Sequence, residues 1–147
     1  MERLLRVMIL LIGVLLFPGC SNDVLDASYR TTSDAVAAGA VKHGWIPAWV
    51  PSTATDLREV HDVDSNQSAL SFSLLQTAWR PPASCLPASG GEFSEPAFDR
   101  PWIPSSQDLA AAYDFYSCPS GLSGPMLEAV AVQRGGQRVI HWRVLAR

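Results

Sequence analysis

The sequence predicts an α+β fold, in which a small antiparallel sheet ends in a C-terminal β-hairpin and packs against an N-terminal helix and shorter helices. Two runs of strand-forming residues flank Gly135-Gly136, and a glycine pair between such runs is typical of a hairpin turn. Leu70, Phe72 and Leu74 alternate with serines, which is the pattern of a half-buried strand. Because an isolated hairpin is only marginally stable, we expect this strand to join it and the N-terminal helix to cover one side.

The chain begins with a secretory signal. Arg3 and Arg6 give a positive start, and residues 7–17 form an apolar stretch. As a helix this stretch would reach about 16 Å, roughly half of the hydrocarbon layer of a bilayer. The pattern therefore favours export, with removal of residues 1–19, over a permanent transmembrane helix.

The signal ends in Phe17-Pro18-Gly19-Cys20, which resembles the lipobox of bacterial lipoproteins. In that family the cysteine carries acyl chains, such as palmitate, and becomes the new N-terminus. The resemblance implies lipidation at Cys20, and Ser21 after it implies an outer-membrane location that faces the periplasm. Phe17 and Pro18 depart from the usual leucine and small residue, and an ordinary cleaved signal is the alternative.

The rest of the chain has the size of one domain. Removing residues 1–19 from the 147-residue chain leaves 128 residues, which we divide into a lipidated tether at 20–28 and a globular domain at 29–147. The formal net charge is −3, and no basic cluster occurs. This charge argues against nucleic acid as a partner. The expected partners are the membrane, reached through the lipid, and an envelope protein.

The chain has three cysteines. With Cys20 assigned to lipid, Cys85 and Cys118 remain as a pair in an oxidising compartment, where a disulfide bond is expected. Two free buried thiols are the alternative. These cysteines lack the closely spaced ligand pairs that zinc prefers, so we expect no metal there.

The first half of the domain contains one helix and one irregular segment. A cap at residues 32–33 begins the helix, and Gly44 is expected to end it. Residues 45–51 contain two prolines, which exclude a regular element. A short helical turn is expected next, with Asp56 and Glu59 spaced as a capping pair.

The second half contains short elements separated by loops. In order, we expect a polar turn at 62–66, a strand at 69–76, an irregular segment at 80–104, a short helix capped at 105–106 and reaching 113, an extended segment at 113–118 and a loop at 119–125.

The register of the hairpin follows from its glycine turn. Pairing outward from the turn sets Ala129 opposite Trp142 and Ala131 opposite Ile140 on one face, which we expect to be core. The other face is expected to point outward and carries the pairs Glu128–Arg143, Val130–His141 and Val132–Val139. An ion pair between Glu128 and Arg143 would help to fix the register.

The densest group of polar residues comprises Asp56, Glu59, His61, Asp62, Asp64 and Asn66. Its spacing copies the opening of a calcium loop, but Gln67 stands where that loop needs glycine, and Ser73 where it needs the bidentate glutamate. The sequence therefore favours turn capping by short Asp and Asn side chains, with a looser calcium site as the alternative. We expect no metal and no cofactor.

Two functional alternatives rest on these residues and on nearby tryptophans. His61 could serve as the general base of a periplasmic hydrolase, although the adjacent Asp62 would point to the opposite face of a strand. Trp45 and Trp49, with Trp102, could line a groove for a glycan or small ligand. Packing against the core is the simpler interpretation of these rings, and no catalytic residue is assigned.

Residues 44–66 contain the pattern GWIP…P-x-TATDL-x-E-x-HD-x-D-x-N. This pattern resembles a block found in small bacterial envelope proteins, in the family named YbbD head domain. The resemblance implies an exported α+β domain and assigns no activity, cofactor or catalytic residue. The sequence thus favours a lipid-anchored envelope protein that acts as a non-enzymatic interaction or structural module.

Overall fold

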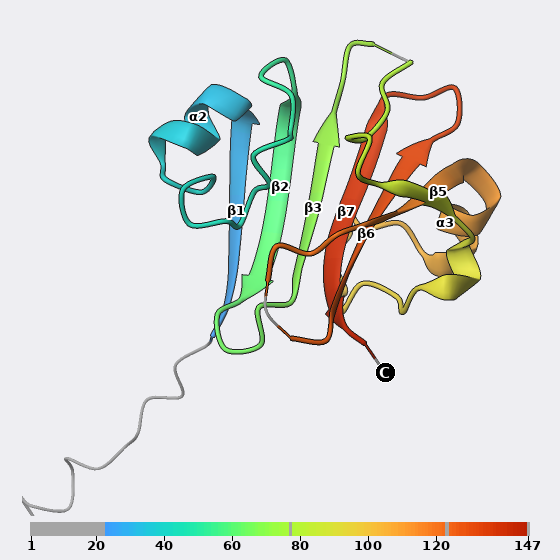
Figure 1. The fold of residues 1–147 in the computed structure, drawn as a ribbon. Coiled ribbons are helices and arrows are strands. Elements are labelled where there is room, and N and C mark those ends of the chain that lie inside the picture. The colour runs from blue at the N-terminus through green and yellow to red at the C-terminus, as the bar shows by residue number, and fades with distance from the viewer. Residues whose placement is uncertain (1–22, 77, 123, 147) are drawn as a thin grey trace, which may run out of the picture.

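The computed structural model describes residues 23–76, 78–122 and 124–146, and its core is a seven-stranded antiparallel sheet (Figure 1). The strand order is β1-β2-β3-β7-β6-β5-β4. The strands are β1 (Val24–Thr31), β2 (Thr55–Asp62), β3 (Ser68–Ser73), β4 (Leu86–Ala88), β5 (Tyr113–Cys118), β6 (Met126–Gln133) and β7 (Arg138–Leu145). The helices are α2 (Thr32–Ala37), the 3-10 helix η1 (Gly90–Glu92) and α3 (Ser106–Ala112). The fold is therefore richer in sheet than the expected α+β arrangement.

The C-terminal hairpin has the register that the sequence predicts. β6 and β7 pair Ala129 with Trp142 and Ala131 with Ile140, and the pairs expected on the other face are also formed. That other face does not point outward, however, because His141 is completely buried. The hairpin lies at the centre of the sheet, where β3 pairs with β7 and β5 with β6. Its two edges are therefore paired, and other segments cover its faces.

Each face of the sheet has its own apolar core. We call one the lid face, which carries Leu70, Phe72 and Val130 and is covered by residues 35–54. We call the other the Trp142 face, which is covered by residues 93–112 from the loop before α3 and from α3 itself. A sheet covered on both sides explains why its central strands are apolar on both faces rather than alternating.

Helix α2 has Thr31 as its N-cap, one residue before the expected cap at 32–33, and it ends early. The side chain of Thr31 accepts a hydrogen bond from the backbone of Asp34, whose carboxylate caps Thr31 in return. The helix was expected to reach Gly44 but ends at Ala37, because Gly39 adopts a φ of +82° and turns the chain. The Trp45 backbone N–H then bonds the Ala40 carbonyl, so the segment after α2 folds back over the sheet.

The helical turn expected at Asp56 and Glu59 is wrong, because these residues belong to β2. β2 pairs with β1 on one side and β3 on the other, and this pairing outweighs the local capping signal. The polar turn after β2 is confirmed. There the Asp62 carboxylate accepts hydrogen bonds from the Asp64 and Ser65 backbones, as short acidic side chains do in turns.

The sheet begins closer to the N-terminus than expected. β1 starts at Val24, so residues 24–28 form an edge strand and are not a tether. Cys20 and the signal lie outside the described residues, and lipidation stays a prediction. None of the described helices is long and apolar enough to cross a membrane.

The disulfide bond between Cys85 and Cys118 is confirmed, and it joins an otherwise irregular segment to the sheet. Cys118 ends β5, and the residues after Cys85 form the short edge strand β4 beside it. The short helix α3 is also confirmed, with Ser105 as its N-cap.

Replacing both Cys85 and Cys118 with serine should destabilise the protein. The bond closes a loop between residues that are 33 positions apart. In the chain-entropy model, opening such a loop lowers the free energy of unfolding by about 3–4 kcal/mol. Chemical denaturation of the two proteins measures the difference, with the wild-type protein in excess reductant as the matched control. Equal midpoints for oxidised wild type and variant would show that the bond does not hold the segment.

Candidate functional site: a buried polar cluster and an open groove

The polar residues singled out from the sequence do not form one site. They run along β2 and into the turn after it, and alternate side chains of a strand point to opposite faces. Glu59 and His61 point to the lid face, whereas Asp62 caps the turn. Asp56 instead forms exposed ion pairs with Arg58 and Arg138.

Glu59 and His61 meet charged residues from strands that are distant in sequence. We call Glu59, His61, Glu128, His141 and Arg143 the polar cluster. Cross-strand pairing places all five on the lid face, in two neighbouring rows. One row runs His61, Ser68, Arg143 and Glu128, and the next runs Glu59, Leu70, His141 and Val130. The sequence could not show this grouping, because it depends on the order of the strands.

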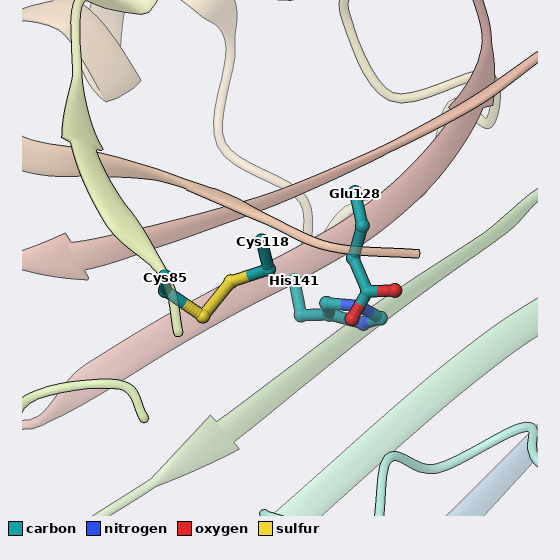
Figure 2. Close-up of a disulfide and its surroundings, with 4 residues drawn as sticks. All are labelled: Cys85, Cys118, Glu128 and His141. Atoms are coloured by element: carbon teal, nitrogen blue, oxygen red, sulfur yellow. A yellow bond between two sulfur atoms is a disulfide. The ribbon is translucent and has the colours of Figure 1, made fainter. Parts of the chain in front are cut away.

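The cluster is held together by short polar contacts. The His61 Nδ1 atom lies 2.8 Å from Glu59 Oε2, within a hydrogen bond. The His141 Nε2 atom lies 3.0 Å from Glu128 Oε1, without the alignment of a hydrogen bond. Figure 2 shows this carboxylate beside the imidazole, with the disulfide bond close by. Among the described residues, Glu128 forms no ion pair with Arg143, its partner in the register, and contacts His141 instead.

Arg143 ties the sheet to the segment that covers it. Its Nε atom donates a hydrogen bond to Ser68 Oγ at 2.9 Å, and its Nη2 atom donates to the Gly44 carbonyl at 2.8 Å. We call residues 38–51 the lid. The guanidinium group thus binds the lid directly, and a charged hydrogen bond of this kind is stronger than a neutral one.

The predicted binding residues Trp45 and Trp49 belong to the lid and pack onto the cluster. Trp45 stacks on His61 with ring centroids 4.1 Å apart, and its ring also stacks with exposed His43 at 4.9 Å. Trp49 meets His141 edge-on at 5.5 Å. Both tryptophans also pack against the core of the lid face. Core packing, the simpler interpretation of these rings, therefore accounts for them.

Burial decides the charge states within the cluster. Desolvation raises the pKa of Glu59 and lowers the pKa of His141. Burial also opposes ionisation of Glu128, but its contact with His141 and the charge of Arg143 outweigh that effect and lower its pKa. Glu128 and Arg143 are thus the stable charges of the cluster, and His141 stays neutral more readily than an exposed histidine.

The cluster has the pairing of a general base but not its accessibility. Glu59, rather than the adjacent Asp62, orients His61. However, only 1% of Glu59 and 4% of His61 is exposed, and Trp45 covers the imidazole. Within the described residues, no group of three or more His, Cys, Asp or Glu side chains is placed to hold a metal ion. The cluster can hold buried charges in balance, but Glu59 and His61 are too buried to contact a substrate in this conformation.

An open groove lies on the Trp142 face, over β1 and β2. It has a volume of about 610 Å³ and is formed by β1, β2 and Trp102. Ser28 and Arg58 are paired across β1 and β2 on this face, and both are exposed. At the same edge Arg100 binds Asp26 through two hydrogen bonds of 2.8 and 2.9 Å. Trp102 therefore lies on the opposite face from Trp45 and Trp49.

Replacing His141 with leucine should flatten the loss of stability on acidification. The folded state disfavours protonated His141, whereas the unfolded chain takes up the proton near its ordinary pKa of 6.5. Stability is therefore complete above that pKa and falls by about 1 kcal/mol between about pH 7.5 and 5.5. Glu59 has the opposite effect on stability, because its raised pKa makes stability fall as the pH rises. Glu59 is present in both proteins.

Urea midpoints at the two pH values measure this slope. His43→Asn is the matched control, because it replaces a histidine that is exposed in the folded protein. An identical slope in wild type and His141→Leu would contradict the assignment of a buried neutral imidazole.

The comparison with protein families matches one part of the chain. The YbbD head domain family matches residues 23–73, a range that covers β1, α2, the lid, β2 and β3. Comparison with curated proteins and with solved structures gave no match. The matched range includes the predicted pattern at 44–66 together with Glu59 and His61. The match at residues 23–73 agrees with the resemblance that the sequence pattern at 44–66 indicates.

Proposed function

We propose that this protein is a lipid-anchored envelope protein that acts as a non-enzymatic interaction module. One observation supports the interaction role. The side chains with the chemistry for catalysis lie buried under the lid, whereas the open surface is a groove lined by polar and aromatic residues. Binding needs an accessible surface of this kind, while general acid–base catalysis needs the cluster itself to be reached.

The anchor is supported by the N-terminal sequence and by the disulfide bond. Phe17-Pro18-Gly19-Cys20 follows an apolar signal, and Cys85 and Cys118 form a bond that persists in oxidising compartments. β1 begins at Val24, which leaves a short connection between Cys20 and the sheet. The proposal places the domain in the periplasm, held at the outer membrane.

The interaction surface is the groove over β1 and β2. Among the described strands, β1 lies at the edge of the sheet and pairs with β2 alone, and an edge strand of this kind can pair with a partner. Trp102 supplies an aromatic wall, and Arg58 and Ser28 supply exposed hydrogen-bonding groups. Surfaces that combine a fixed aromatic ring with polar groups are enriched at protein interfaces.

Substituting Cys20→Ala should release the protein from the membrane fraction. Without the thiol no acyl chain can be attached, and a single exported domain has no other anchor in this proposal. Fractionation of cells, with detection of the chain in the membrane and soluble periplasmic pools, measures the change. Ser21→Ala is the control and should leave the protein in the membrane. Equal membrane retention of both variants would overturn the anchor.

A photo-cross-linking residue at Ser28 should form adducts in intact cells, because Ser28 lies in the groove. The same residue at Ser33, an exposed serine of α2, is the matched control and should give few adducts. Adducts are separated by gel and identified by mass spectrometry. Equal yields at the two positions would show that the groove is not the preferred interaction surface.

A further inference from the structure

Four of the seven exposed large apolar side chains of the described residues lie at one end of the sheet. Leu25 is 46% exposed, Val63 47%, Leu145 45% and Leu122 37%. Leu25 is the second residue of β1, Val63 directly follows β2, Leu145 ends β7, and Leu122 lies in the loop between β5 and β6. We call these four residues the apolar end.

Antiparallel pairing brings the four residues to the same end. At the start of β1, Val24 pairs with Asp62, and the Val63 backbone N–H bonds the Asp23 carbonyl at 3.0 Å. Met126 at the start of β6 pairs with Leu145. In Figure 1 the start of β1, the turn between β2 and β3 and the C-terminus lie along the lower edge of the sheet.

The opposite end of the sheet differs in its chain connections. Leu75 is exposed there, beside the hairpin turn, and Val36 is exposed on α2. Neither is near the point where the chain enters the domain, because β1 runs from Val24 toward α2. Only the apolar end lies beside the N-terminal connection.

The length of that connection indicates what the apolar end contacts. Three peptide steps separate Cys20 from Asp23, and they span at most about 11 Å. If Cys20 carries acyl chains in a bilayer, the apolar end is held within about that distance of the lipid headgroups. This step rests on the proposed function. Apolar side chains held at a bilayer surface gain by entering its interface.

The charges at this end indicate the kind of bilayer. Asp23, Asp62 and Asp64 lie there, and the charge of Asp23 raises the pKa of Asp64 because the two carboxylates are close together. Carboxylates repel an anionic lipid surface and attract the ammonium groups of phosphatidylethanolamine.

We propose that the apolar end docks on the surface of a zwitterionic bilayer rich in phosphatidylethanolamine, with Leu25, Val63 and Leu145 in its interface. The lipid anchor brings the domain to the membrane, and this contact sets its orientation. The strands then point away from the bilayer, and the groove over β1 and β2 stands beside the membrane surface with its aromatic wall accessible.

Spin labels on the mature lipidated protein, reconstituted into vesicles of phosphatidylethanolamine and phosphatidylcholine, test the docking. Cys85 and Cys118 are bonded to each other and Cys20 is acylated, so Val63→Cys and Leu145→Cys each provide one free thiol. Each label should gain several-fold in accessibility to oxygen and lose accessibility to a water-soluble nickel complex. A label at Leu75→Cys, on the opposite end, should stay as it is in water.

Serine substitutions separate the apolar contact from the anchor. Leu25→Ser with Leu145→Ser should lower the oxygen accessibility of the Val63 label, whereas Val36→Ser with Leu75→Ser should not. All these residues are exposed, so the fold should persist. Adding phosphatidylglycerol to the vesicles should also lower the Val63 signal, because carboxylates and anionic lipid repel each other.

Vesicle flotation distinguishes a failure of the lipid anchor from a failure of the docking. If the protein does not float with vesicles, the anchor is absent and both proposals fall. If it floats but the Val63 and Leu75 labels are equally accessible to oxygen, the docking alone is overturned and the anchor stands. A Val63 signal that rises with phosphatidylglycerol would overturn the choice of a zwitterionic surface.

Discussion

The fold depends on balancing charge beneath the lid. Because β3 and β7 lie at the centre of a sheet that is covered on both faces, any charged side chain on their lid face is removed from water. Desolvating an unpaired charge costs several kcal/mol, more than most single contacts return. Glu59, Glu128 and Arg143 satisfy this constraint together, with His61 against Glu59 and His141 against Glu128.

Arg143 connects this balance to the shape of the molecule. Its hydrogen bond to the Gly44 carbonyl joins the central strand to the lid, and Trp45 and Trp49 then close over the imidazoles. The lid lacks regular structure because its two prolines and the φ of +77° at Gly44 prevent a helix. Its place is therefore fixed by contacts with the cluster and the core, together with turn hydrogen bonds such as that from the Trp45 backbone to the Ala40 carbonyl. Such a cluster supports the lid.

The sequence predicted what depends on local spacing. The glycine turn set the register of β6 and β7 correctly, Ser105 marked the start of α3, and the cysteine count paired Cys85 with Cys118. Predictions failed where strand order decides the outcome. His141 was expected outside and is buried, because the alternation of one hairpin does not reveal that segments 35–54 and 93–112 cover the two faces of the sheet.

The candidate site shows the same division. Glu59 and His61 are two residues apart in β2, so their contact follows from strand periodicity once β2 is recognised as a strand. Glu128, His141 and Arg143 come from the other half of the chain, and only the order β2-β3-β7-β6 brings them beside β2. Trp102 appeared to belong with Trp45 and Trp49 by residue type alone, and the sheet separates them.

Carbethoxylation of histidines by diethyl pyrocarbonate, located by mass spectrometry, tests the central claim that the polar cluster is sealed and structural. The chain has three histidines, of which His43 is exposed and His61 and His141 are buried. The account predicts rapid modification of His43 alone in the folded protein, and of all three histidines after unfolding. Modification of His61 in the folded protein at the rate of His43 would contradict it, because the cluster would then be open to molecules the size of a substrate.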